Sequence, residues 1–291
     1  MSNSVLVTGA NGTIGTHLLR VLRSTPWDVR ALIRSAENER LVTSLGSQAY
    51  YGDFMDQASL GEAMMGMDTL VLITSANPDA AVQASNALRV AKDCGVRKVV
   101  RVSAIKAAPD GPTANTVLHG HTEQEIISSD LDYVILRPNL FMQNMFLAAQ
   151  TISEQSSFFF GTGNAQMGMV DTRDVAECAA QCVLSNQFDG NIYEVTGPQS
   201  LSYFDVAQAL SAELNRTISY VPVSPQDVYE GIVGAGWDKW IAGISRDYAQ
   251  AYRSGWGDFT TDTVEQICGY PPRGIDRFIR EVLCAQAALS V

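Results

Sequence analysis

The sequence predicts an α/β fold, a Rossmann-type doubly wound parallel sheet joined to a small, mainly helical C-terminal lobe. Three observations support this expectation. Short apolar runs alternate with helical patterns through the first half of the 291 residues, a glycine-rich turn follows the first run, and the alternation weakens after Pro138. Strands that alternate with helices form parallel sheets, because each parallel connection needs a long crossover.

Six expected strands are short runs of aliphatic and β-branched residues. They begin at Ser4 (SVLVTG), Asp28 (DVRALIR), Gln48 (QAYYGD), Asp68 (DTLVLIT), Arg97 (RKVVRVSA) and Leu131 (LDYVILRP). Helical patterns such as THLLRVLRS and AAVQASNALRVAKDCG separate them. Because runs such as VLVT and TLVLIT are apolar on both faces of a strand, we expect helices to cover both faces of the sheet.

The second half of the chain is less regular. It contains a helical pattern at 171–185, a strand-like run at 191–197, and further helical patterns at 201–215, 224–236 and 275–287. We expect residues 1–197 to form the Rossmann domain and residues 198–291 to form the C-terminal lobe, with segments from about 139–170 interleaved.

The composition is typical of a globular protein. Hydrophobic residues make up 46% and charged residues 18%, and the formal net charge is −11 without a cluster of Lys and Arg. Nucleic acid and anionic membranes would be repelled by this charge. Five dispersed cysteines favour reduced thiols, and neither a signal peptide nor an apolar run of about 18 residues is found. We expect a cytoplasmic monomer or homodimer without a metal site.

A glycine-rich turn follows the first expected strand. The segment TGANGTIG spaces Gly9, Gly12 and Gly15 as Gly-x-x-Gly-x-x-Gly at the start of a helical pattern. Glycine permits a tight turn and a close backbone approach, and a helix N-terminus offers free N–H groups to a pyrophosphate. This strand–turn–helix context predicts a dinucleotide site rather than a purely structural turn.

The residue after the second expected strand indicates which dinucleotide binds. NAD-specific folds place an acidic residue there, which binds the ribose 2′-hydroxyl. This chain has Arg34, and a guanidinium suits a 2′-phosphate that an acid would repel. The sequence therefore favours NADP(H) over NAD(H), with Ser35 as a helper; a solvated surface arginine is the alternative.

Asp53 and Phe54 follow the third expected strand and allow two interpretations. At the carboxyl edge of the sheet, Asp53 would accept a hydrogen bond from the adenine amine and Phe54 would flank the ring. An aspartate at the end of a strand is also a common turn former. The residues alone do not decide between the two.

With TGANGTIG, Arg34, GDFMD, VSA and LRPNLFMQN in view, the sequence resembles the NmrA-like atypical short-chain dehydrogenase/reductases, nearly from end to end. The late segments YEVTGPQSLSYFDVAQALS and GYPPRGIDRFIRE resemble the substrate-side lobe of that family. The family includes NADPH-dependent quinone, triphenylmethane-dye and azo-dye reductases, imine or enal reductases, and redox sensors that bind nicotinamide nucleotides without turnover. A shared fold therefore does not fix the function.

The resemblance also implies positions for the cofactor. The phosphate loop would comprise Gly9, Asn11, Gly12, Thr13, Ile14 and Gly15. Arg34 would bind the 2′-phosphate, and Asp53 and Phe54 would contact the adenine. Around the nicotinamide, Thr74 and Ser75 would lie beside its ribose, while Ser103 and Pro138 would lie near the ring.

The catalytic Tyr-x-x-x-Lys pair of typical short-chain dehydrogenases is missing. No tyrosine of this chain is followed by a lysine four residues later, and Val117 and His121 occupy the two places. A ketone needs a positioned proton donor, worth about 10² to 10⁴ in rate. For a quinone, an iminium carbon or a cationic dye, positioning carries most of the catalysis. The loss therefore indicates a delocalised electrophile as the substrate, or no chemistry at all.

His119 and His121 are the candidate catalytic residues. An imidazole with an ordinary pKa of about 6.5 is able to donate a proton at neutral pH. Residues i and i+2 do not share a helix face, so we expect at most one of the two to line a ligand site. His121 would occupy the place of the missing lysine, whereas His119 would pair with Glu123. A surface or capping histidine is the alternative for each.

Asn139, Phe141, Asn144 and Trp237 are the candidate substrate residues. Polar groups within the apolar stretch LRPNLFMQN suit the wall of an aromatic substrate pocket, and they suit a core-packing helix equally well. The sequence thus predicts an NADPH-dependent reductase that delivers hydride to a conjugated, quinone-like or iminium-type molecule. The alternatives are a regulator that senses NADP(H) without catalysis, and an isomerase or cyclase on the same fold.

Overall fold

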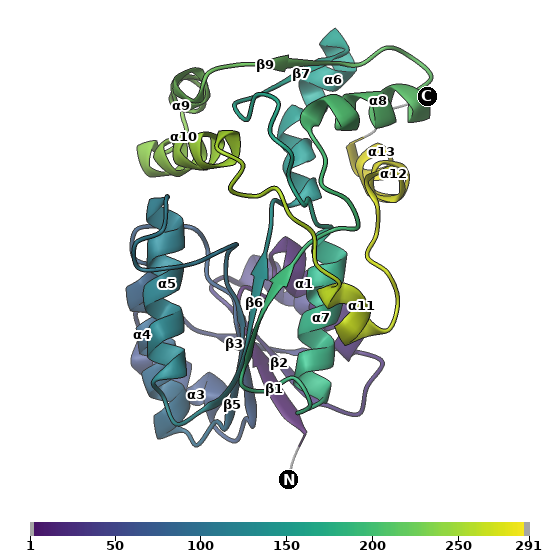
Figure 1. Ribbon diagram of the computed structural model, residues 1–291. Helices are drawn as coiled ribbons and strands as arrows, with labels where there is room; N and C mark the ends of the chain where they lie inside the picture. The colour runs from purple at the N-terminus through teal and green to yellow at the C-terminus, as the bar shows by residue number, and fades with distance from the viewer. Residues whose placement is uncertain (1–2, 288–291) are drawn as a thin grey trace. The chain divides into compact units, whose positions relative to one another are not determined.

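The structure is a computed structural model that describes residues 3–287 (Figure 1). The chain folds into two compact units, each assembled from segments that are distant in the sequence. The first unit comprises residues 1–111, 116–137 and 172–194, and the second comprises 112–115, 138–171 and 195–291.

The first unit is built on a mostly parallel sheet, which confirms the predicted fold class. Within the described residues the sheet has seven strands in the order β3-β2-β1-β4-β5-β6-β8. All six expected strands form, at β1 (Ser4–Val7), β2 (Asp28–Ile33), β3 (Gln48–Tyr51), β4 (Thr69–Leu72), β5 (Lys98–Val102) and β6 (Asp132–Pro138), and β8 (Asn191–Val195) follows β6 at the edge. Register pairs such as Val5 with Val29 and with Thr69 place the carboxyl ends of β1, β2 and β4 side by side.

Helices cover both faces of this sheet. Figure 1 shows α3 (Gln57–Met64), α4 (Ala80–Asp93) and α5 (Ala114–Ile127) on one face, and α1 (Thr13–Leu22) with α7 (Thr172–Leu184) on the other. The short helices η1 (Ala36–Asn38) and α2 (Glu39–Ser44) connect β2 to β3. The apolar side of α1 explains its position, because Ile14, Leu18 and Leu22 recur at helical spacing and are buried.

The second unit is mainly helical and also contains a small sheet. The sheet pairs β7 (Ser157–Phe160) with β9 (Ser219–Pro222) in parallel. Its helices are η2 (Met142–Ala148), α6 (Ala149–Gln155), α8 (Tyr203–Glu213), α9 (Pro225–Gly234), α10 (Lys239–Arg253), α11 (Thr263–Cys268), α12 (Ile275–Phe278), η3 (Ile279–Leu283) and α13 (Cys284–Ala287). An aromatic cluster of Phe158, Phe160, Tyr203 and Tyr220 packs the sheet against α8.

Two helices of the second unit start at capping boxes. Ser202 and Asp205 form reciprocal hydrogen bonds at the start of α8, and Ser224 and Asp227 do so at α9, where Pro225 occupies the first turn. Between residues 3 and 287, no helix combines the length and the apolar character that crossing a membrane requires.

Candidate functional site

The turn between β1 and α1 depends on glycine at two positions. Gly9 adopts φ +60°, a left-handed conformation that favours glycine. A Cβ atom on Gly15 would lie 2.3 Å from the carbonyl oxygen of Gly9, which is too close for any side chain. Gly12 differs, because its Cβ would lie 3.2 Å from that oxygen and its own N–H donates to it at 3.0 Å. The glycines at 9 and 15 therefore shape the loop, whereas Gly12 lies at its exposed mouth.

The N-terminus of α1 is open to an anion. Gly12 is the N-cap and supplies no side-chain cap, and the first turn carries no acidic residue. The first N–H groups of a helix have no partner within the helix and carry a partial positive charge. Asn11 and Thr13 are exposed beside them. These residues fit the pyrophosphate of a dinucleotide, as the sequence predicts.

Arg34 directly follows β2 at the same edge of the sheet. Its side chain is exposed, and its guanidinium makes no hydrogen bond or ion pair with any residue that the structure describes. Because β1 and β2 pair in parallel, Arg34 leaves the sheet beside the end of β1 and the glycine turn. A free cation therefore stands where the 2′-phosphate is expected.

Asp53 and Phe54 lie in the turn that follows β3, and Asp53 acts as the turn former that was one of its two predicted roles. Asp53 Oδ1 accepts a hydrogen bond from the N–H of Met55 at 2.8 Å. Phe54 is half-buried and packs against the apolar core of the first unit. Because the turn uses only Oδ1 of Asp53, Oδ2 is left to accept a hydrogen bond from adenine, and that contact stays a prediction.

A buried polar cluster occupies the carboxyl ends of the next strands. We use this name for Arg101, Ser103, His119, Glu123, Arg137 and Glu194, which come from β5 and its end, α5, β6 and β8. Arg101 is the most buried member of the cluster and is 1% exposed. Its guanidinium donates to the Leu72 carbonyl at 3.1 Å and to Thr74 Oγ1 at 2.9 Å, and it contacts His119 Nδ1 at 3.1 Å.

Two carboxylates balance the arginines of this cluster. Glu123 accepts a short hydrogen bond from the Ser103 hydroxyl and a forked pair of bonds from Arg137. Arg137 also donates to Glu194 at 3.3 Å, and the backbone N–H of Lys106 donates to the same carboxylate. Burial raises the pKa of Glu194, while these donors oppose the rise. A charge-assisted network therefore fixes the side chains beneath the end of β5.

The structure brings one of the two candidate histidines into this cluster. His119 faces the sheet and is 9% exposed, whereas His121 is exposed on α5. Burial first, and the neighbouring Arg101 cation second, lower the pKa of His119 well below its usual value. The structure gives no direct hydrogen bond between His119 and Glu123, which were predicted to pair; Ser103 contacts both side chains instead.

The remaining cofactor candidates lie along the same strand ends. Thr74 follows β4 and accepts from Arg101, and Ser75 is exposed beside it. Ser103 is buried after β5, and Pro138 ends β6. Arg101 and Glu194 were not among the residues predicted to form the site. A charged residue inside the apolar run KVVRVS was the available signal for Arg101.

The four substrate candidates lie in the second unit. Asn139 is buried there, where its Nδ2 donates to the Gly257 carbonyl at 3.0 Å and its Oδ1 accepts from the Tyr252 hydroxyl at 3.0 Å. Phe141 and Asn144 are half-buried at the start of η2. Trp237 is 60% exposed between α9 and α10. Asn139 therefore stabilises the interior of this unit, and Trp237 projects from it.

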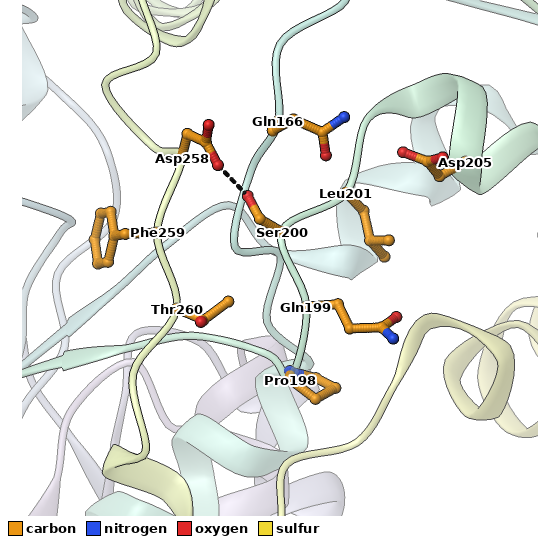
Figure 2. Close-up of a pocket in the computed structure, with 9 residues that line it drawn as sticks. All are labelled: Gln166, Pro198, Gln199, Ser200, Leu201, Asp205, Asp258, Phe259 and Thr260. Atoms are coloured by element: carbon orange, nitrogen blue, oxygen red, sulfur yellow. Dashed lines mark hydrogen bonds between the residues drawn. The ribbon is translucent and has the colours of Figure 1, made fainter.

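The second unit also contains an open pocket of about 650 Å³, which Figure 2 shows. Asp205 and Asp258 give it a negative charge, and Ser200 Oγ donates to Asp258 at 2.7 Å. None of the substrate candidates belongs to its lining, which consists of Gln166, Pro198, Gln199, Ser200, Leu201, Asp205, Asp258, Phe259 and Thr260.

Comparisons with known proteins identify the family and the fold. A family profile described as NAD(P)H-binding matches residues 9–186. An NAD(P)H azoreductase from Xenophilus azovorans is 31% identical over 280 residues, which cover 95% of this chain and 96% of the relative. The NADPH complex of quinone oxidoreductase QOR2 from Escherichia coli has a TM-score of 0.87 at 22% identity, covering 96% and 99% of the two chains. Triphenylmethane reductase from Citrobacter sp. has a TM-score of 0.85 at 22% identity, covering 96% and 99%.

The doubly wound sheet and the open helix N-terminus define a dinucleotide-binding protein. The chain belongs to the NAD(P)H-binding family, and its resemblance to the NmrA-like atypical short-chain dehydrogenase/reductases is confirmed. It is therefore an NAD(P)H-dependent oxidoreductase.

Proposed function

We propose that the protein is an NADPH-dependent reductase of conjugated, quinone-like or iminium-type small molecules. The observation that carries the substrate class is that the buried polar cluster, as far as the structure describes it, contains neither a tyrosine nor a protonated histidine that could act as an acid. His119 is held neutral there, and no Tyr-x-x-x-Lys pair exists in the chain. A delocalised electrophile accepts hydride without a strong acid, whereas an ordinary ketone depends on one. The names of the azoreductase and the two structural neighbours support this class.

The first unit would hold the cofactor along one edge of its sheet. When bound, NADPH supplies a hydride from its nicotinamide ring. The open N-terminus of α1 binds the pyrophosphate, and Arg34 binds the 2′-phosphate. Thr74 and Ser75 contact the nicotinamide ribose, and Ser103 orients the ring together with Pro138. The protein thus contributes placement and a site that excludes water.

The preference for NADPH depends on Arg34. We expect Arg34→Glu to lower the ratio of NADPH to NADH affinity by about 10- to 100-fold, because it replaces charge-assisted hydrogen bonds of about 1.5–3 kcal/mol with repulsion. Nucleotide fluorescence titration measures both affinities. Arg40→Glu is the matched control, since Arg40 is an exposed arginine on α2 that this site does not use. Gly12→Val should abolish binding of both nucleotides by filling the mouth of the loop. Unchanged affinities in Arg34→Glu and Gly12→Val would overturn the cofactor assignment.

Turnover is tested by nicotinamide absorbance with a panel of quinones, azo dyes, cationic dyes, imines and enals. We expect oxidation of NADPH, faster than that of NADH, with at least one of these classes and not with simple ketones. A protein that binds NADPH but oxidises it with none of them would instead be a nucleotide sensor.

A further inference from the structure

The proton of His119 is confined to one ring nitrogen by its neighbours. Nδ1 lies 3.1 Å from Arg101 Nη2 and 3.3 Å from Ser103 Oγ. A guanidinium only donates hydrogen bonds, so Nδ1 has to accept from Arg101 and carries no proton. The single hydroxyl hydrogen of Ser103 goes to Glu123, with which it forms a short bond. Arg101 is therefore the donor that decides the tautomer.

Arg101 is a fixed charge at neutral pH. Burial lowers its pKa to about 10, and Glu123 opposes that decrease. Two further acceptors, the Leu72 carbonyl and Thr74 Oγ1, hold the guanidinium in place. The remaining charged groups of the cluster are Glu123, Arg137 and Glu194, and Arg137 binds both carboxylates. Arg101 is thus the cation that contacts the imidazole directly.

The other ring nitrogen of His119 is available to a ligand. Nε2 makes no hydrogen bond to any described residue, and His119 keeps 9% of its surface exposed. Thr74 and Ser103, which the proposed function places at the nicotinamide end of the cofactor, contact Arg101 and His119 respectively. The imidazole of His119 therefore lies beside the place where hydride transfer is proposed.

We infer that Arg101 is a positioning residue that locks His119 as a neutral Nε2–H donor, and that this N–H binds the oxygen or nitrogen atom of the substrate that gains electron density. The inference rests on the proposed reductase function. The substrate accepts a hydride with its electron pair and becomes an anion, or a neutral amine from an iminium. Any proton that the anion needs comes from water, and His119 keeps its own. The histidine therefore stabilises developing charge without acting as a general acid.

Nitrogen-15 NMR of the histidine-labelled, nucleotide-free protein tests the tautomer without turnover. The chain has three histidines, and His17→Gln and His121→Gln assign their signals. We expect His119 to show a protonated Nε2 and an unprotonated Nδ1 throughout the range from about pH 6 to 8, where an ordinary imidazole titrates. A proton on Nδ1, or a titration of His119 within this range, would overturn the inference.

Substitution of Arg101 should allow His119 to adopt the other tautomer. In Arg101→Met, Nδ1 is free to carry the proton and donate it to Ser103 Oγ, so the Nδ1–H tautomer should appear and the ring should titrate nearer its ordinary pKa. Arg101→Lys keeps a cationic donor and should preserve the wild-type signals. Arg30→Met is the matched control, because Arg30 is also a strand arginine bound to backbone carbonyls, on β2. An identical His119 signal in Arg101→Met and wild type would refute the assignment to Arg101.

The kinetic test separates this inference from the proposed function. With an active substrate, kcat/KM of the wild type should be independent of pH across about pH 6 to 8, and Arg101→Met should introduce an inflection. His119→Leu should reduce kcat by about 10²- to 10³-fold, as the loss of one donor to a developing anion does. His119→Gln retains an amide N–H and should recover part of that loss. If NADPH is not oxidised at all, the proposed function fails; if it is oxidised with unchanged kcat in His119→Leu, only the role of His119 fails.

Discussion

The buried neutral state of His119 predicts a specific pH dependence of stability. The unfolded chain takes up a proton at this histidine below its ordinary pKa of 6.5, whereas the folded protein does not, because burial and Arg101 lower the pKa. The unfolded state therefore binds more protons as the pH falls, and folding loses stability in that direction. The contribution is fully present above about pH 6.5 and is lost as the pH decreases below it.

The magnitude follows from the linkage of one proton. Each pH unit below the unfolded pKa costs about 1.4 kcal/mol until the folded pKa is reached. One proton limits the integrated loss between about pH 7 and pH 5 to at most about 2 kcal/mol, which is reached when the folded imidazole stays neutral over the whole interval. His119→Gln has no titrating group at this position, so its free energy of unfolding should fall less over the same interval, by up to about 2 kcal/mol.

Urea unfolding followed by circular dichroism, in wild type and in His119→Gln at several pH values, measures this difference. Other titrating groups, including Glu194, whose pKa is raised by burial, contribute in both proteins and largely cancel. His121→Gln is the matched control, since that histidine lies exposed on the same helix. Equal pH dependence in wild type and His119→Gln would refute the conclusion that His119 is buried in its neutral form.

Two further predictions concern packing in the first unit. Gly15→Ala should lower the free energy of unfolding by about 1–3 kcal/mol, because the new Cβ would lie 2.3 Å from the carbonyl oxygen of Gly9. Gly61→Ala on α3 places its Cβ in open space, so it should stabilise the folded protein by about 0.5–1 kcal/mol. Thermal unfolding measures both effects. Lys98→Met should lower the free energy of unfolding in urea titrations by about 3–5 kcal/mol, because it leaves the Asp189 carboxylate without its buried partner. The double variant Lys98→Met, Asp189→Leu removes both charges and should recover most of that loss.

The fold of the first unit was predictable because its signals are local. Each expected strand is a run that is apolar on both faces, which specifies a position inside a covered parallel sheet. The glycine turn was predictable for the same reason, since the conformation of Gly9 and the close contact at Gly15 are requirements of adjacent backbone. The second unit was harder. Its small sheet pairs β7, where Phe158 is buried, with β9, which lies far along the chain, so no local pattern indicates that the two strands meet.

The buried polar cluster was not predictable from spacing. Its contacts join β5, α5, β6 and β8, and which helix face carries a histidine toward the sheet depends on the rotational phase of α5. The sequence limited the choice to at most one of His119 and His121, and the structure places His119 inward. The role of Glu194 could not be predicted from the local sequence, because the run NIYEV reads the same whether its glutamate faces solvent or pairs with an arginine such as Arg137.

The arrangement of charges explains why the loss of Tyr-x-x-x-Lys is compatible with an intact site. In a general acid, the imidazole must gain a proton before each turnover, and a neighbouring carboxylate usually favours that charged form. Here the nearest charged group to Nδ1 is the guanidinium of Arg101, while the carboxylate of Glu123 is occupied by Ser103 and Arg137. As long as Arg101 is charged, it disfavours the protonated form of His119 and so opposes proton delivery by that histidine. The proposed substrate class is consistent with this constraint, because quinones, azo compounds and iminium ions share the property of stabilising the incoming electron pair themselves.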